Sequence, residues 1–214
     1  MKFSRNINSL PNELLCEIFL LAVNPYSART DRCRLILVCR LWKKHVEDSA
    51  LLWADISARG GRAYIRRALE NSKASMINLH YPEHNEAHID LESFMAEAGP
   101  YIARWRSLTV VARWSPQWES ALDPLTSAQA PSLEFLELCL FGPGYLTPAK
   151  AITLFGGALA PSTLKYLTLS HVQVAIEPLG LSGLPDQQFG PCWHWVSIVS
   201  HPTYHATKAQ FPEA

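Results

Sequence analysis

The chain has 214 residues, of which 48% are hydrophobic, and its formal net charge is zero. That apolar content is enough to bury a core, so the composition excludes a chain that is disordered throughout. The balanced charge excludes a protein that binds nucleic acid mainly through phosphate contacts. On length alone, we expect one or two domains.

Nothing in the sequence is typical of a membrane or secreted protein. The apolar run at residues 14–23 contains Glu17 and is too short to span a bilayer. It also lacks a basic leader and a small-residue cleavage site. The cysteines are odd in number and scattered, which is typical of reduced core residues. They are Cys16, Cys33, Cys39, Cys139 and Cys192. We therefore expect a cytoplasmic or nuclear protein that binds neither membrane nor nucleic acid.

The first quarter of the chain is predicted to be helical. Between residues 10 and 23, apolar residues recur at steps of three and four, which indicates an amphipathic helix. Pro11 suits the first turn, and Asn24 with Pro25 ends the helix. A second helix is predicted from about Asp31, with a third, short one at residues 45–48. So small a module is marginal alone, and its surplus of apolar residues predicts a face for a partner.

Three sequence blocks in this region resemble the F-box. They are Leu10-Pro11-x-Glu13-Leu14-Leu15-x-x-Ile18-Phe19, then Val38-Cys39-Arg40-x-Trp42, then Leu52-Trp53-x-x-Ile56. The resemblance implies a three-helix module at residues 7–57 that docks on the Skp-type adaptor of cullin–RING ubiquitin ligases. The adaptor-binding residues it implies are Leu10, Pro11, Leu14, Leu15, Ile18, Val38 and Trp42. The alternative is that they form only a helical core, and Trp53 is assigned to the core.

Residues 58–180 read as degenerate leucine-rich-like repeats. Short apolar runs marked by Leu79, Val110, Leu138 and Leu169 recur at steps of 28–31 residues. Each run alternates like a strand, and helices are predicted between the runs at residues 63–72, 91–103 and 149–160. This arrangement resembles the irregular leucine-rich repeats of fungal F-box proteins, although the Asn or Cys that ends each strand motif is missing. The alternative is an unrelated α/β domain with a small parallel sheet.

Residues 181–214 break the pattern and are expected to form an irregular tail, with one further short strand near residues 192–199. Residues 200–214 show no periodicity, and disorder is an open alternative for them. The array has no polar cap at its end, which leaves truncation open as well.

Groups that carry chemistry are weak in this sequence. His80, His84 and His88 are spaced four apart, but Pro82 interrupts a helix there, so a solvated loop is favoured over a metal site. A second set in the tail, Cys192 with His194, His201 and His205, lacks a paired CxxC. Arg62, Arg66 and Arg67 favour a solvated helix face over a phosphodegron contact. Phosphate-loop and nucleophile-elbow motifs are absent.

The sequence therefore predicts an α+β or α/β repeat fold, in which a three-helix F-box precedes a short irregular solenoid of strands and helices. The predicted function is that of a substrate-recognition subunit in a Skp–cullin–F-box ubiquitin ligase, without an enzymatic site, metal or cofactor. Its partners would be the adaptor, a cullin through the adaptor, and a protein substrate. The alternative is an adaptor-binding scaffold, or a truncated F-box protein, that delivers no substrate.

Overall fold

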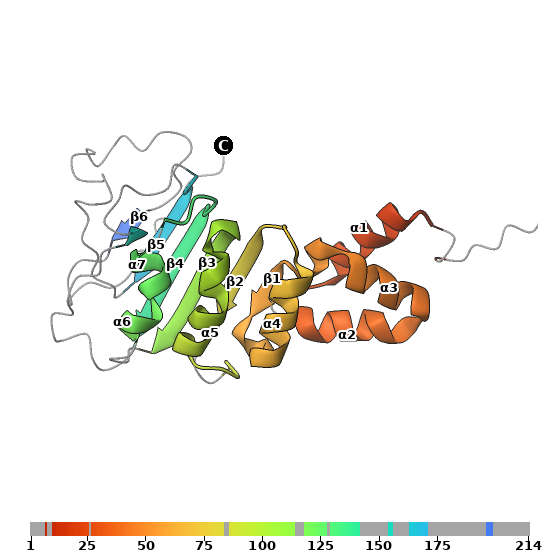
Figure 1. Cartoon of the computed structure of the whole chain (residues 1–214), viewed down its shortest axis with the longest axis horizontal. Coiled ribbons are helices and arrows are strands. Elements are labelled where there is room, and N and C mark those ends of the chain that lie inside the picture. Colours follow the sequence, from red (N-terminus) through yellow and green to blue (C-terminus); the bar gives the residue numbers. More distant parts are fainter. Residues whose placement is uncertain are drawn as a thin grey trace, which may run out of the picture.

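The computed structural model describes residues 7, 10–25, 27–83, 86–113, 118–127, 129–141, 154–155, 163–170 and 196–198. Helices at one end of the molecule precede a parallel sheet that is covered by further helices (Figure 1). The N-terminal elements are α1 (Asn12–Ala22), α2 (Ala28–Val38), α3 (Arg40–Asp48) and the 3₁₀ helix η2 (Ala50–Trp53).

The first helix forms where the periodicity predicts it. Pro11 stands at its N-cap and Glu13 lies in its first turn, where the helix dipole favours an acid. The next stretch differs from the prediction, because α2 begins at Ala28 and the predicted second helix is divided. Cys39 is extended, with φ −162° and ψ 170°, and separates α2 from α3. No proline or glycine marks this break in the sequence, so local signals do not reveal it.

Six parallel strands follow in the sequential order β1-β2-β3-β4-β5-β6. They are β1 (Asp55–Ser57), β2 (Ile77–Tyr81), β3 (Trp105–Arg113), β4 (Phe135–Phe141), β5 (Tyr166–Ser170) and β6 (Val196–Ile198). The last strand lies within the short strand predicted near residues 192–199. The first strand falls inside the stretch assigned to the F-box, so the helical module and the sheet share residues 55–57.

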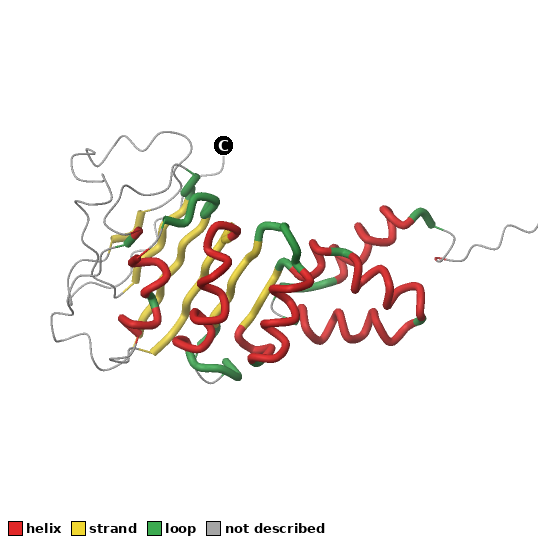
Figure 2. Tube along the Cα trace, in the orientation of Figure 1, coloured by secondary structure: helices red, strands yellow, loops and turns green. Residues whose placement is uncertain are grey.

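The connections between strands place helices on one face of the sheet (Figure 2). They are η3 (Ala58–Gly60), α4 (Arg62–Asn71), α5 (Leu91–Ala98), η4 (Gly99–Arg104), α6 (Trp118–Ala121) and α7 (Asp123–Ser127). The predicted helix at 91–103 therefore ends early and continues as a 3₁₀ helix around Pro100. The pair α6 and α7 was not predicted. Most of the predicted helix at 149–160, and the whole of residues 199–214, lie outside the described residues.

Side chains alternate across the sheet as the strand pattern predicts. Leu79, Leu108, Leu136 and Leu167 pair in register, are all nearly fully buried, and are 29, 28 and 31 residues apart. Three of the predicted markers, Val110, Leu138 and Leu169, pair in register. The first marker is corrected by two residues, because Val110 pairs with Tyr81 and not with Leu79. One continuous core of buried residues runs from Leu15 in α1 to Leu169 in β5.

The four cysteines that the structure describes are free, as expected, but they are not core residues. Cys33 is exposed, and Cys16, Cys39 and Cys139 are half-buried. Most of them lie in apolar stretches of sequence, which suggested burial, so the expectation of core cysteines was wrong for these four. Cys192 lies outside the described residues.

A candidate docking surface on the N-terminal helices

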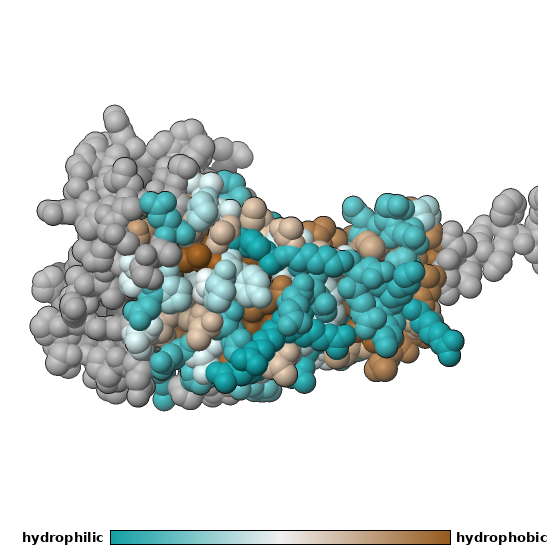
Figure 3. Space-filling model, viewed as in Figure 1, coloured by the Kyte–Doolittle hydropathy of each residue, from teal (hydrophilic) through white to brown (hydrophobic). Residues whose placement is uncertain are grey.

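Large apolar side chains are exposed mainly at the N-terminal end of the molecule. Of the eleven that the structure shows exposed, nine fall between residues 7 and 51. These nine residues, here called the apolar surface, are Ile7, Leu14, Ile18, Leu20, Leu21, Leu37, Val38, Leu41 and Leu51. Figure 3 shows apolar atoms gathered at this end of the molecule. Isolated exposed aliphatics are ordinary, but such a concentration marks an interaction site.

Helix α1 presents two unlike sides. Leu14, Ile18 and Leu21 are exposed and follow the spacing of residues on one side of a helix, with Leu21 86% accessible. Leu15 and Phe19 are fully buried on the side that enters the core. The buried side fixes the helix to the module, and the other side leaves a large part of each of its three aliphatic side chains accessible.

The break between α2 and α3 exposes a second group of aliphatics. Leu37 and Val38 close α2 and are 83% and 58% accessible, and Leu41 follows in α3. Trp42, one residue further, is half-buried and packs on Phe19 with 4.7 Å between ring centroids. The tryptophan therefore connects the exposed aliphatics of α3 with the core beneath α1.

The predicted adaptor-binding residues divide by burial. Leu14, Ile18 and Val38 are exposed and belong to the apolar surface, and Pro11 is exposed at the start of α1. Leu10 is half-buried and packs against the core. Leu15 is fully buried, so in this structure it supports the surface from beneath and forms no part of it. Exposed Leu21 and Leu37 were missed. The helical spacing of Leu21 from Leu14 and Ile18 was readable in the sequence, whereas Leu37 lies beside the unpredicted break at Cys39.

A buried arginine joins the helical module to the sheet. Arg32 in α2 is 1% exposed, and its guanidinium donates to the carbonyl oxygen of Asp55 in β1 at 2.7 Å and to the hydroxyl of Tyr64 in α4. It also lies over the rings of Trp53 and Tyr64. Burial lowers the pKa of Arg32, and the charges of Tyr64 and Asp55 oppose that effect. The charge is costly to bury, so these contacts favour one orientation of α2 on the sheet.

Further contacts tighten this junction. Arg29 donates to the carbonyl oxygen of Gly60 at 3.0 Å. A Cβ atom on Gly60 would lie 2.3 Å from the ring of Tyr64, so only glycine allows the ring to pack there. Trp53 is buried as predicted, and its indole N–H donates to the carbonyl oxygen of Val46 at 2.7 Å. The helical module is thus fixed to the first strand on several sides.

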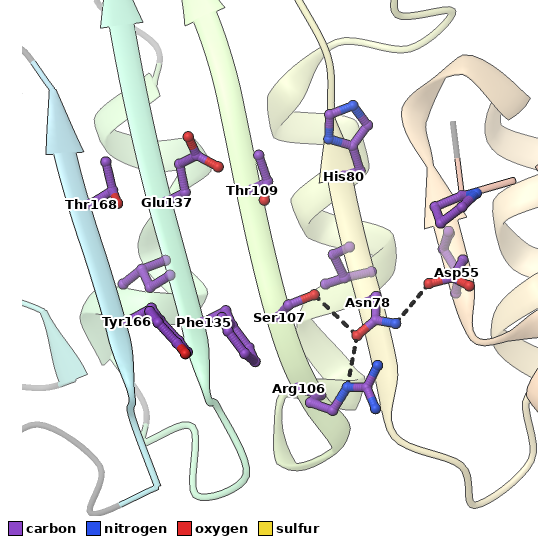
Figure 4. Close-up of a pocket in the computed structure, with 14 residues that line it drawn as sticks. Asp55, Asn78, His80, Arg106, Ser107, Thr109, Phe135, Glu137, Tyr166 and Thr168 are labelled. Carbon is purple, nitrogen blue, oxygen red and sulfur yellow. Dashed lines mark hydrogen bonds between the residues drawn. The ribbon is translucent and has the colours of Figure 1, made fainter. Parts of the chain in front are cut away.

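The face of the sheet opposite the core carries polar and aromatic side chains (Figure 4). Its first row across the strands is Asp55, Asn78, Ser107, Phe135 and Tyr166. The second row is Ser57, His80, Thr109, Glu137 and Thr168. Residues of both rows line a trough with a cavity volume of about 510 Å³, which we call the sheet trough.

Hydrogen bonds organise one side of the sheet trough. The amide of Asn78 donates to Asp55 at 2.7 Å, and its carbonyl oxygen accepts from Ser107 and from Arg106, each at 3.1 Å. Burial, followed by the charge of Arg59, lowers the pKa of His80, so this histidine is neutral at pH 7. On β4 and β5, the rings of Phe135 and Tyr166 stack 4.5 Å apart and within 8° of parallel.

Of the three histidines considered as metal ligands, His80 lies on β2. His88 is exposed in the segment between β2 and α5, and His84 lies outside the described residues. Among the described residues, no group of three His, Cys, Asp or Glu side chains is arranged to hold a metal ion.

The basic side chains of α4 form ion pairs: Arg62 and Arg66 pair with Glu97, and Arg67 pairs with Glu47. Within the described residues, no helix has the length and apolar character needed to cross a bilayer.

Comparison with known proteins identifies the N-terminal region alone. No curated protein and no solved structure matches the chain. The model of the F-box-like family matches residues 7–59, about a quarter of the chain. The match covers α1 to α3, all nine residues of the apolar surface, and the first strand of the sheet. The chain therefore contains an F-box-like domain at residues 7–59.

Proposed function

We propose that this chain is the substrate-recognition subunit of a Skp–cullin–F-box ubiquitin ligase. F-box domains bind Skp-type adaptors, and the adaptor would dock on the apolar surface. The observation that carries the proposal is the concentration of exposed aliphatics on α1, α2 and α3 within the matched family region. A partner that covers them removes apolar area from water, which drives association. An interface of ordinary size, roughly 1,600 Å² in total, is expected.

The proposed contacts are the exposed or partly exposed members of the predicted set. Leu14, Ile18 and Val38 would be buried by the adaptor, while Leu10, Pro11 and Trp42 would border the contact. Leu15 would act from beneath by holding α1 in place. Aliphatic and aromatic anchors that become fully desolvated dominate most interfaces.

We further propose that the sheet and its helices form the substrate-binding region, as a short irregular leucine-rich-like solenoid. Two features support it: the strands follow one another in sequential parallel order, and their register repeats every 28–31 residues. Parallel sheets are usually covered on both faces, whereas one face here bears polar side chains and a trough. An open face of stacked repeats is a common binding surface.

In this proposal the chain itself performs no chemistry. It raises the concentration of a bound substrate near the conjugating enzyme that other subunits supply, and the reaction is accelerated by proximity. The Arg32 junction supports such a role, because a fixed F-box keeps the sheet trough at a fixed position relative to the adaptor. A cytosolic or nuclear location follows from the partners.

The test is binding of the purified chain to a Skp-type adaptor, alone and with a cullin, at physiological salt. We expect a stable complex with both. Replacing Leu14 and Val38 together by Asn removes two desolvated anchors, so adaptor affinity should fall about 100-fold or more. The matched control is Met76→Asn, which changes an equally exposed apolar residue outside the surface.

Two results would contradict the proposal. One is a folded wild-type chain that retains no adaptor, and the other is a double variant that binds within about threefold of wild type. If the adaptor is retained but no cullin joins it, the chain is a scaffold that binds the adaptor without entering a ligase.

A further inference from the structure

The sheet trough contains an aromatic ring, Phe135, that stacks on one neighbouring ring and has no second ring on its other face within the described part of the chain. One face of Phe135 packs on Tyr166, and the ring is 38% exposed. Figure 4 shows both rings edge-on, standing up from β4 and β5, with the small side chain of Ser107 on the next strand. A ring in this position offers its π face to a side chain that enters the trough between β3 and β4.

A carboxylate lies on the same face of the same strand. Glu137 is two residues beyond Phe135, so the two side chains point to one side of the sheet. The thiol of Cys139 donates to a carboxylate oxygen of Glu137, with 3.7 Å between sulfur and oxygen. Burial raises the pKa of that thiol to about 11, so at neutral pH the thiol stays protonated and acts as a weak donor. The carboxylate therefore keeps acceptor capacity for a ligand.

The positive charge of the trough lies away from Glu137. The guanidinium of Arg106 is bonded to Asn78, in the row that lies nearer the start of the strands. His80, which shares the row of Glu137, carries no charge at pH 7 because its pKa is lowered. Asp55 contributes a second carboxylate at the far end of the Asn78 row. The trough is thus lined by two carboxylates, Asp55 and Glu137, against the one guanidinium of Arg106, and this net charge favours a cation beside Glu137.

We propose that the sheet trough binds an extended segment of a protein, with a lysine or arginine side chain lying against Phe135 and directed to the carboxylate of Glu137. This deepens the proposed function, on which it rests for the statement that the bound protein is a substrate. A cation over an aromatic ring is attracted by the ring's quadrupole, and a carboxylate beside it adds a charge-assisted hydrogen bond.

The dimensions suit a short extended peptide. Neighbouring strands are about 4.8 Å apart, so the distance from β2 to β5 is roughly 14 Å, which about four extended residues span. The cavity volume of about 510 Å³ is in the range of sites that take small ligands. Side chains from alternate positions of such a peptide would meet the rows of Ser107, Thr109 and Thr168, which offer hydroxyl groups.

The test uses short peptides of glycine and serine that differ only at one central residue, which is Arg, Lys, Gln or Glu. Their affinities for the full chain are measured by chemical-shift titration. We expect the Arg and Lys peptides to bind about tenfold more tightly than the Gln peptide, with the Glu peptide weakest. Glu137→Gln should abolish most of this preference. Phe135→Leu keeps an apolar side chain but removes the ring, and should weaken Arg and Lys binding about fivefold or more.

The matched control is Glu134→Gln. Glu134 lies just before β4 and pairs with Lys165 outside the trough, so its loss should leave peptide binding unchanged. The inference is overturned if the Gln peptide binds as tightly as the Arg peptide, or if folded Glu137→Gln keeps the preference. Adaptor binding is measured on the same samples. If the chain binds the adaptor but not the cationic peptides, this inference alone is refuted. If it binds the cationic peptides but not the adaptor, the proposed ligase role alone is refuted.

Discussion

The two candidate surfaces differ in the chemistry that they offer. The apolar surface consists of aliphatic side chains on helices, and its strongest exposures, at Leu21 and Leu37, exceed 80%. The sheet trough consists of hydroxyl, amide, carboxylate and aromatic groups on strands, with apolar side chains alternating into the core beneath. The first surface suits a constant partner that covers a large area. The second has the directional groups by which a ligand is selected.

In the proposed function, this difference separates attachment to the adaptor from recognition of a substrate. Aliphatic contacts are non-directional and tolerate small shifts, whereas hydrogen bonds and charges require defined positions. The Arg32 junction holds the two surfaces in one arrangement, so changes to one surface should leave the other intact. The following experiments test that separation.

The largest effect is expected from two adjacent leucines with opposite exposures. Leu15 is fully buried, and Leu15→Ala should lower the free energy of unfolding by about 3 kcal/mol, because it leaves a cavity in the core. Leu14 is 51% exposed, and Leu14→Ala should change that free energy by less than about 0.5 kcal/mol while weakening adaptor binding about tenfold. Denaturant unfolding measures the change in stability of each variant, and adaptor titration measures the change in its affinity. Equal stability losses in the two variants would contradict the assignment of the surface.

A somewhat smaller loss is expected at the junction. Arg32→Met keeps the apolar stem but removes the donors to Asp55 and Tyr64 and the charge over Trp53. Two partly buried acceptors then lose their donor, so the free energy of unfolding should fall by about 2 kcal/mol.

The control for Arg32→Met is Arg34→Met on the same helix. Arg34 has a side chain that is 75% exposed and pairs with Asp31 three residues away, so its loss should have little effect. If Arg34→Met destabilises the chain as much as Arg32→Met, the loss reflects helix α2 and not the junction.

The smallest effect is expected in the pH dependence of stability, through His80 in the sheet trough. His80 has a pKa below the ordinary value of 6.5, because burial disfavours its charged form. As pH falls, His80 takes up a proton in the unfolded chain at a higher pH than in the folded chain. The free energy of unfolding therefore decreases progressively below pH 6.5. Unfolding measured between about pH 7 and pH 5 should show a shallower loss in His80→Gln than in wild type. An identical slope in the two proteins would show that His80 does not contribute.

Much of the fold could be predicted because its patterns are local. The apolar spacing of α1 and the alternation in β3, β4 and β5 each depend on a few neighbouring residues, and the sheet confirms these strands. The break at Cys39 was missed because tertiary packing, and no proline or glycine, divides α2 from α3. Strand β1 was missed because three residues carry too little pattern and gain their structure from pairing with β2.

The two surfaces were predictable to different degrees. The apolar surface lies in a motif whose residues are close in sequence, so its exposed members Leu14, Ile18 and Val38 were identified. The sheet trough combines Asn78, Ser107 and Phe135, which are about 28 residues apart and meet only through strand register. The role of Arg32 was also hidden, because an arginine on a helix with many basic neighbours reads as solvent-exposed.

The central claim is that the apolar surface, and not the sheet, binds the adaptor. Hydrogen exchange of the full chain, free and with a Skp-type adaptor, tests it most directly. Added protection is predicted in peptides from α1, α2 and α3, with none in the strands that line the sheet trough. Protection over β3 and β4 without protection over α1, or no complex at all with a folded chain, would contradict the account.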